Sequence, residues 1–231
     1  MYLKYSHYLT TVSHIEKKNL ENLGVTRKCY VIPEGAHSVF ARYARANVPE
    51  TDSILFLGII EERKGLRYLL EAAPLIAEKA PGVKLVIAGR GDLSKYAGLI
   101  AKATNLEVLN TFLPDEKVTE LVQQAKVVVL PYVTATGSSV LSVAYALGKP
   151  VVVTAVGSFP ELVPQGETGL VVPPRDARSL AEAIIQLLSN NVLRKEMGRR
   201  ASVKAREEIS WDKIADMTLN VYRDVLKENV T

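Results

Sequence analysis

The stretch KVVVLPYVTATGSSVLSVAYALGKPVVVT, residues 126–154, decides the fold. It contains two nearly all-apolar, β-branched runs, at 126–131 and 150–154, separated by a hydroxyl-rich loop and a helical pattern at 138–148. Apolar runs without alternation are typical of strands buried on both faces of a parallel sheet. Gly148, Lys149 and Pro150 mark the end of the helix and the start of the next strand. The stretch therefore predicts a strand, a helix and a second strand.

The same pattern extends in both directions along the chain. Further apolar runs predict strands at 53–58, 84–89, 106–110 and 169–172, and helical patterns lie at 65–80, 92–104, 115–125 and 176–188. Asp92 and Asp176 stand where they could cap the helices that follow them. Strands that alternate with helices predict an α/β fold with a doubly wound, Rossmann-like parallel sheet.

The two ends of the chain differ from this core. Ser13 and Glu16 have the spacing of a capping box for a helix that runs to about Gly24, and KCYVIP predicts one strand at 28–33. Residues up to 49 therefore look like the tail of another unit. After residue 190, two helical stretches at 192–209 and 211–228 follow without a strand between them and predict a C-terminal helical extension.

The composition excludes several classes of protein. A hydrophobic content of 48% with 23% charged residues is typical of a soluble globular domain. The net charge of +4 comes from basic residues interleaved with acidic ones, which indicates solvated helix faces and argues against nucleic-acid binding. A single cysteine, Cys29, excludes an internal disulfide and favours a reducing, cytoplasmic location. No segment approaches the roughly 20 apolar residues of a membrane span, although peripheral membrane contact stays open.

Ligands of open parallel sheets bind at the carboxyl ends of the strands, so the loops there form the candidate site. Small, hydroxyl-bearing or basic residues suited to a phosphate group occupy two of these loops: Gly58, Arg63, Lys64, Thr136, Gly137, Ser138 and Ser139. Gly89 and Arg90, in the loop after the second strand, allow close backbone approach. Simpler interpretations stay open, because basic residues near a helix start are usually solvated and hydroxyl-rich turns often only cap a helix.

The order of these blocks resembles the C-terminal, nucleotide-sugar-binding domain of family 4 (group 1) glycosyltransferases, which have the GT-B fold. FLGIIEERKGLRYLLEA resembles the strand-glycine-lysine-glycine block of the family, and ALGKPVVVTAVGSFPELVPQGETGLVVPPRDARSLAEAI resembles its long C-terminal signature. The flanks resemble the end of the N-terminal domain with the linker and the final helix of the family. The resemblance thus divides the chain into a remnant and linker at 1–49, a nucleotide-sugar-binding domain at 50–208, and a helix at 209–231 that packs across the domain interface.

The resemblance implies retaining transfer of a sugar from a nucleoside diphosphate sugar to an unidentified acceptor. The diphosphate is expected at Lys64 and at the loop 136–139. The base is expected over four residues of two loops: Gly89, Arg90, Phe112 and Leu113. Glu161 matches an acidic residue that could contact the sugar, or it is simply solvated at a helix start. No cofactor or metal is expected, and the resemblance assigns no catalytic residue here. His7, His14 and His37 are expected at the surface or at an interface.

The chain departs from the family pattern at three positions. Ile59 stands where an arginine is usual, with Arg63 as a candidate substitute, and Ala135 and Val143 stand where two glutamates normally contact the donor. Donor binding through the hydroxyls and amides of 136–139, a different donor, or a degenerate domain would each explain the missing glutamates, and we favour the first.

The bulk of the acceptor-binding domain is absent from the sequence, which leaves two further alternatives. The chain could be a non-catalytic nucleotide-binding or regulatory module, or a fragment that is inactive without an acceptor domain. A separate acceptor-domain chain or a second copy of this chain could complete the site. An unrelated α/β protein of the response-regulator type would need clustered acidic residues at the strand ends, which this sequence lacks.

Overall fold

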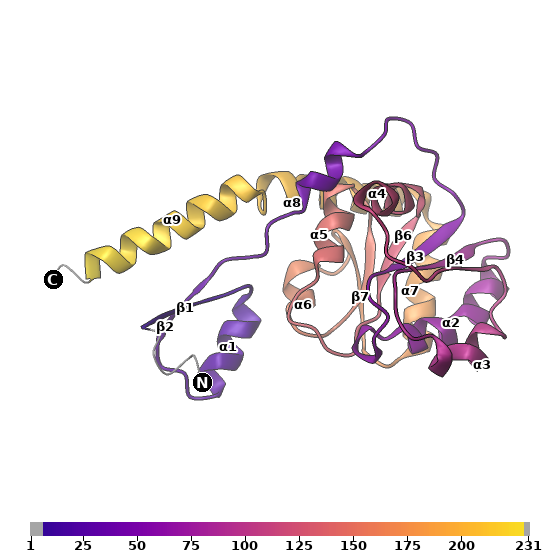
Figure 1. Cartoon of the computed structure of the whole chain (residues 1–231), viewed down its shortest axis with the longest axis horizontal. Helices are drawn as coiled ribbons and strands as arrows, with labels where there is room; N and C mark the ends of the chain where they lie inside the picture. The colour runs from indigo at the N-terminus through magenta and orange to yellow at the C-terminus, as the bar shows by residue number, and fades with distance from the viewer. Residues whose placement is uncertain (1–6, 229–231) are drawn as a thin grey trace.

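A six-stranded parallel sheet forms the centre of the larger part of the molecule in the computed structural model, which describes residues 7–228 (Figure 1). The strand order is β5-β4-β3-β6-β7-β8, so the order reverses between β3 and β6, as in doubly wound dinucleotide-binding folds. All six strands predicted for the core are confirmed: β3 (Ser53–Leu57), β4 (Lys84–Ala88), β5 (Leu106–Leu109), β6 (Val127–Leu130), β7 (Val151–Thr154) and β8 (Gly169–Val172).

Helices cover both faces of this sheet. Alternate residues of each strand point to opposite faces, and both faces carry apolar side chains that the helices bury. In β3, Ile54 and Phe56 pack with α2 (Leu66–Lys79) and α7 (Ala177–Ser189), whereas Leu55 and Leu57 pack on the opposite face. That second face is covered by four helices: α4 (Asp115–Gln124), α5 (Ser139–Ala146), α6 (Phe159–Leu162) and part of α8 (Asn191–Glu207). The burial of the strands on both sides explains their uninterrupted apolar sequences.

Most of the predicted helix boundaries are confirmed, but one helix is largely missing. Asp176 caps α7, with its Oδ1 accepting a hydrogen bond from Ser179 N at 2.9 Å. The prediction of one helix at 92–104 is wrong, because only a 3-10 turn (Ser94–Tyr96) and the four-residue α3 (Ala97–Ile100) form there. The carboxylate of Asp92 accepts a hydrogen bond from Ser94 N at 2.8 Å and so stabilises the turn, and Gly98 is a poor helix former.

A small unit at the N-terminal end lies beside α9 (Trp211–Glu228), away from the six-stranded sheet (Figure 1). It consists of β1 (Tyr8–Thr11), α1 (His14–Asn22) and β2 (Lys28–Val31), and its two strands pair in parallel. The sequence did not predict β1, which is short and lacks an apolar run. Tyr8 Oη donates a hydrogen bond to the Glu228 carboxylate at 3.1 Å, which joins the unit to α9. None of the described helices combines the length and apolar composition needed to cross a bilayer.

An ion cluster with two buried cations fastens the linker to the large domain. The carboxylate of Glu50 lies 2.8 Å from Lys149 Nζ and 3.2 Å from Arg194 Nη2. Both cations are almost fully buried, with 7% and 5% of the residue exposed. The linker continues from β2 through the 3-10 helix η2 (Ser38–Arg42), which packs against α4 and α5. The segment between the two parts of the chain is therefore held on the large domain.

Candidate functional site

Three loops meet at the carboxyl ends of β3, β4 and β6, and glycines allow them to stack on one another. Gly65 has a φ of 68°, and a Cβ there would lie 1.8 Å from the carbonyl oxygen of Pro131. Gly89 has a φ of 139°, and a Cβ there would lie 2.0 Å from the carbonyl oxygen of Gly58. Both residues combine a left-handed backbone with backbone contact, which only glycine allows. The loops therefore form one compact platform.

A cavity of about 390 Å³ opens between this platform and α5. It brings together all four residues predicted for the base, Gly89, Arg90, Phe112 and Leu113, and two of the seven predicted for the diphosphate, Gly58 and Ser139. Its walls are mainly apolar, and the side chain of Phe112 is exposed at 74%. Val143, at the position of a family glutamate, lines the cavity and is buried. An apolar slot with an exposed aromatic ring suits a flat base better than a charged group.

Lys64 is a half-buried cation at the end of the 3-10 turn η3 (Glu62–Lys64). Its Nζ lies 3.8 Å from the centroid of the Tyr132 ring, which is a cation–π geometry. Burial, together with the neighbouring positive charge of Arg63, lowers the pKa of Lys64 to about 8. Within residues 7–228 no carboxylate lies within 4 Å of this ammonium group. In the described part of the chain, this ammonium group therefore contacts an aromatic ring but no carboxylate.

The N-terminus of α5 lies beside Lys64, because Tyr132 contacts both. The Oη of Tyr132 lies 3.0 Å from Ser138 Oγ, so this N-cap hydroxyl is drawn away from the first turn of the helix. Gly58 faces the same turn, since a Cβ there would lie 3.7 Å from Val140 Cγ2. A helix N-terminus without a side-chain cap offers its N–H groups and the positive end of its dipole to an anion. The hydroxyl of Ser138 faces inward, whereas Ser139 is exposed.

Arg63 does not point to this cavity. Its Nε donates a hydrogen bond to the Glu61 carboxylate at 2.6 Å, and its side chain lines a separate basic cavity of about 550 Å³ with Arg67, Lys95 and Arg175. The backbone of Arg63 has a structural role, because its carbonyl oxygen accepts a hydrogen bond from Val133 N at 2.8 Å. The loop holds Lys64 in place, and the Arg63 guanidinium pairs with Glu61 in this structure.

The loop that carries Thr136 and Gly137 is pressed against the start of α6. Thr136 is exposed, and its carbonyl oxygen accepts a hydrogen bond from Ser158 Oγ at 2.6 Å. Glu161, predicted to contact a sugar, is occupied elsewhere: its two carboxylate oxygens accept hydrogen bonds from the backbone N–H groups of His14 and Ile15, each at 3.1 Å. Glu161 thus caps α1 and joins the N-terminal unit to the large domain.

Two residues of the linker line the cavity, although sequence analysis did not place them there. The sequence predicts His37 at the surface or at an interface, and it gives no prediction for Phe40. The two rings pack edge to face, with centroids 6.3 Å apart, at one wall of the cavity. No local pattern identifies them, because they reach the site only when the linker folds back over α4 and α5.

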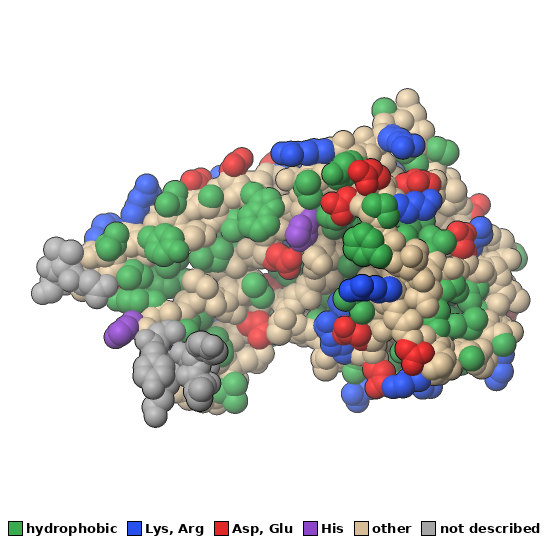
Figure 2. Space-filling view, in the orientation of Figure 1, with side chains coloured by type: hydrophobic (Ala, Val, Ile, Leu, Met, Phe, Trp, Pro, Cys, Tyr) green, Lys and Arg blue, Asp and Glu red, His purple; other side chains and the backbone are tan. Residues whose placement is uncertain are grey.

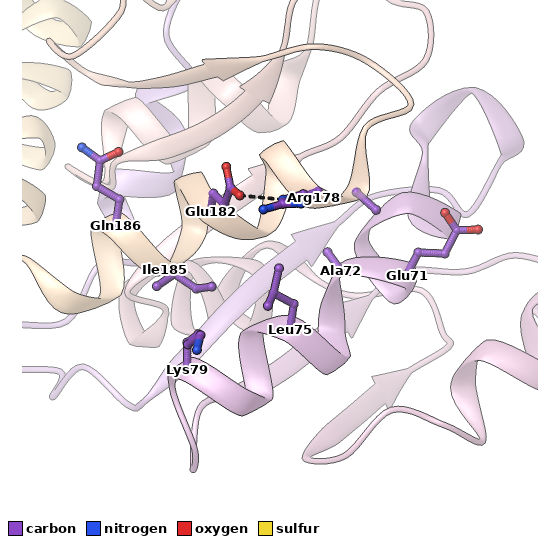
Figure 3. A pocket seen from close by; sticks show the side chains of 9 residues that line it. Glu71, Ala72, Leu75, Lys79, Arg178, Glu182, Ile185 and Gln186 are labelled. Carbon is purple, nitrogen blue, oxygen red and sulfur yellow. Dashed lines mark hydrogen bonds and ion pairs between the residues drawn. The ribbon is translucent and has the colours of Figure 1, made fainter.

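A larger cavity, of about 820 Å³, lies elsewhere, between α2 and α7 (Figure 3). Leu75 and Ile185 face one another across it, and charged side chains surround them, including the ion pair of Arg178 with Glu182 at 3.0 Å. It contains none of the predicted site residues and does not lie at the carboxyl ends of the strands. We therefore place the candidate site in the smaller cavity.

Comparison with known proteins identifies the family of this chain. The sequence model of the family described as "Glycosyl transferases group 1" matches residues 42–204. This chain belongs to the group 1 glycosyltransferases. An uncharacterized glycosyltransferase of Methanocaldococcus jannaschii is 35% identical over 173 residues, which cover 74% of this chain and 44% of the relative. This group 1 glycosyltransferase chain thus spans about half the length of the curated relatives it matches.

Solved structures share the fold of this group 1 glycosyltransferase chain. Sucrose-phosphate synthase from Thermosynechococcus elongatus superposes with a TM-score of 0.82 at 23% identity, covering 98% of this chain and 60% of that protein. HepE of Anabaena, solved in complex with UDP and glucose, superposes with a TM-score of 0.76 at 16% identity, covering 97% of this chain and 64% of that protein. Identities this low establish the fold alone.

Proposed function

We propose that this chain is the nucleotide-sugar-binding part of a retaining glycosyltransferase. The observation that carries the proposal is Lys64, a half-buried ammonium group held over Tyr132 beside the uncapped N-terminus of α5. A diphosphate would satisfy both at once. The adjoining apolar cavity, with Phe112 at its edge, would take the base. The complex of HepE with UDP supports the choice of a nucleotide as ligand.

This arrangement would assist the departure of a nucleoside diphosphate. In the transfer, the bond between the anomeric carbon and a diphosphate oxygen breaks, and a bond to the acceptor oxygen forms on the same face of the sugar. The proton of the acceptor hydroxyl passes to the leaving diphosphate. Negative charge grows on that diphosphate, and Lys64 with the helix dipole of α5 would stabilise it in place. None of these steps needs a metal in this proposal.

The acceptor is proposed to bind on polypeptide that this chain does not contain. The curated relatives are about twice as long, and this chain exposes large apolar side chains on α9: Leu219, Tyr222 and Leu226. Figure 2 shows hydrophobic side chains gathered along α9 on this face of the molecule. A polypeptide that carries the acceptor-binding half would cover this surface and complete the enzyme.

Calorimetric titration with UDP, GDP and ADP, and with UDP-glucose, GDP-mannose and ADP-glucose, tests the proposal. We expect one nucleoside diphosphate to bind at least about tenfold tighter than the other two, since a shaped apolar slot discriminates between bases. Binding of a nucleotide without hydrolysis or transfer of its sugar when an acceptor-domain partner is added would favour a non-catalytic nucleotide-binding module. Failure of all six compounds to bind would contradict the proposal.

A further inference from the structure

Glu34, in the linker, reaches the loop that precedes α5. Its Oε2 lies 3.4 Å from the position that a Cβ on Gly137 would occupy. Its Oε1 lies 3.3 Å from Nε2 of His37, which lines the base cavity. The side chains of Glu34 and His37 are about one-third exposed, at 35% and 29%, so the carboxylate meets both the loop and solvent. A carboxylate therefore stands at the edge of the proposed diphosphate site.

The backbone around Glu34 is fixed by the C-terminal helices. A Cβ on Gly35 would lie 2.8 Å from the indole ring of Trp211, so the ring rests directly on this glycine. Ala36 is 1% exposed, and its N–H donates a hydrogen bond to the carbonyl oxygen of Ile209 at 2.7 Å. Glu34 is consequently held at the loop by packing on both residues that follow it.

The other positions at which the family resemblance places a carboxylate near the donor do not offer a free one. Ala135 and Val143 stand where the family resemblance implies two glutamates, and both oxygens of Glu161 accept backbone hydrogen bonds from α1. In contrast, no hydrogen-bond donor in the described part of the chain reaches Oε2 of Glu34. A half-buried carboxylate oxygen without a donor is suited to accept hydrogen bonds from a ligand.

We propose that Glu34 binds hydroxyl groups of the glycosyl part of the donor, with His37 as the residue that positions it. The inference rests on the proposed function, because the diphosphate must lie at Lys64 and α5 for its sugar to extend towards Gly137. A carboxylate at this place discriminates between two ligands. It accepts hydrogen bonds from the hydroxyls of a nucleoside diphosphate sugar, and it repels the extra negative charge of a free nucleoside diphosphate.

The test measures the ratio of two dissociation constants, that of the nucleoside diphosphate sugar over that of its nucleoside diphosphate. The parent chain is titrated with UDP, GDP and ADP and with UDP-glucose, GDP-mannose and ADP-glucose, and the tightest pair is then used for the variants. We expect Glu34→Ala to raise the ratio by about tenfold, the loss of one charge-assisted hydrogen bond. Glu34→Gln, which keeps an acceptor oxygen, should raise it less. Glu167→Ala, at an exposed turn before β8, is the matched control and should leave it unchanged.

The possible outcomes are distinct. An unchanged ratio in both Glu34 variants would overturn the inference, as would an equal loss of both ligands, which would give Glu34 a role in the phosphate site or in folding. Thermal unfolding of each variant separates a folding defect from a binding defect, and the Glu34→Gln variant keeps the test valid if Glu34→Ala is unstable. If the parent chain binds none of the six compounds, the proposed function itself fails, which is a different result from an unchanged ratio.

Discussion

Nucleoside diphosphate affinity falls by about tenfold to a hundredfold when Lys64 is replaced by methionine, the range expected for one lost charge-assisted hydrogen bond. Methionine keeps an unbranched side chain over the Tyr132 ring, so the loop should stay folded while the charge is removed. Calorimetry measures the change. The matched control is Lys84→Met at the amino end of β4, where the lysine pairs with Glu107 at the surface. Equal affinities of the Lys64→Met variant and the parent would contradict the proposed diphosphate site.

The lowered pKa of Lys64 should make the affinity for a nucleoside diphosphate depend on pH. Burial lowers the pKa of Lys64 to about 8, so the free protein loses this charge as the pH rises through that value. A bound diphosphate favours the charged form, and binding above pH 8 must therefore take up a proton. The affinity of the parent should decline above pH 8, by up to about tenfold for each pH unit. The Lys64→Met variant should lack this decline. If the affinity of the parent does not change between pH 7.5 and about 9.5, Lys64 is not the cation that binds the diphosphate.

A loss of about 3 kcal/mol in the free energy of unfolding is expected for Glu50→Ala, because removal of one partner leaves buried charge uncompensated. Lys149 and Arg194 are both buried and share this single carboxylate. Burial by itself would raise the pKa of Glu50, yet the two cations hold it below its usual value. Urea unfolding of the variant measures the change.

Glu196→Ala provides the control for Glu50. Glu196 also pairs with two basic residues, Arg199 and Arg200, but on an exposed helix face. Surface ion pairs contribute little to stability, so this variant should unfold close to the midpoint of the parent. Similar midpoints for the Glu50 and Glu196 variants would show that the buried cluster does not fasten the linker.

The sheet could be predicted from sequence because its strands are buried on both faces. An apolar, β-branched run such as 126–131, with glycine or proline close to its ends, is typical of a buried strand and of few other structures. The prediction of a helix at 92–104 was wrong. The apolar residues there have helical spacing, but Asp92 stabilises a turn and Gly98 is unfavourable in a helix. The strand β1 was missed because two of its four residues are threonines and it pairs with only one neighbour.

The site could be predicted only where neighbouring residues in the sequence form it. The loops with Gly58, Lys64, Gly89 and Ser139 follow their strands directly, so their approximate meeting point follows from the parallel sheet. The directions in which individual side chains point could not be predicted from the order of the strands and loops. Arg63 turns to Glu61, and the hydroxyl of Ser138 turns to Tyr132. Contacts made by the linker could not be foreseen either, because the linker reaches the loop before α5 only through packing of its backbone on Ile209 and Trp211, where α8 gives way to α9.

A crystal structure of this chain with the nucleoside diphosphate that binds it tightest tests the central claim most directly. We expect phosphate oxygens within about 3 Å of Lys64 Nζ and of the backbone N–H of Ser139 or Val140, with the base against Phe112. A nucleotide in the groove between α2 and α7, or in the basic cavity of Arg67 and Arg175, with Lys64 left untouched, would contradict it.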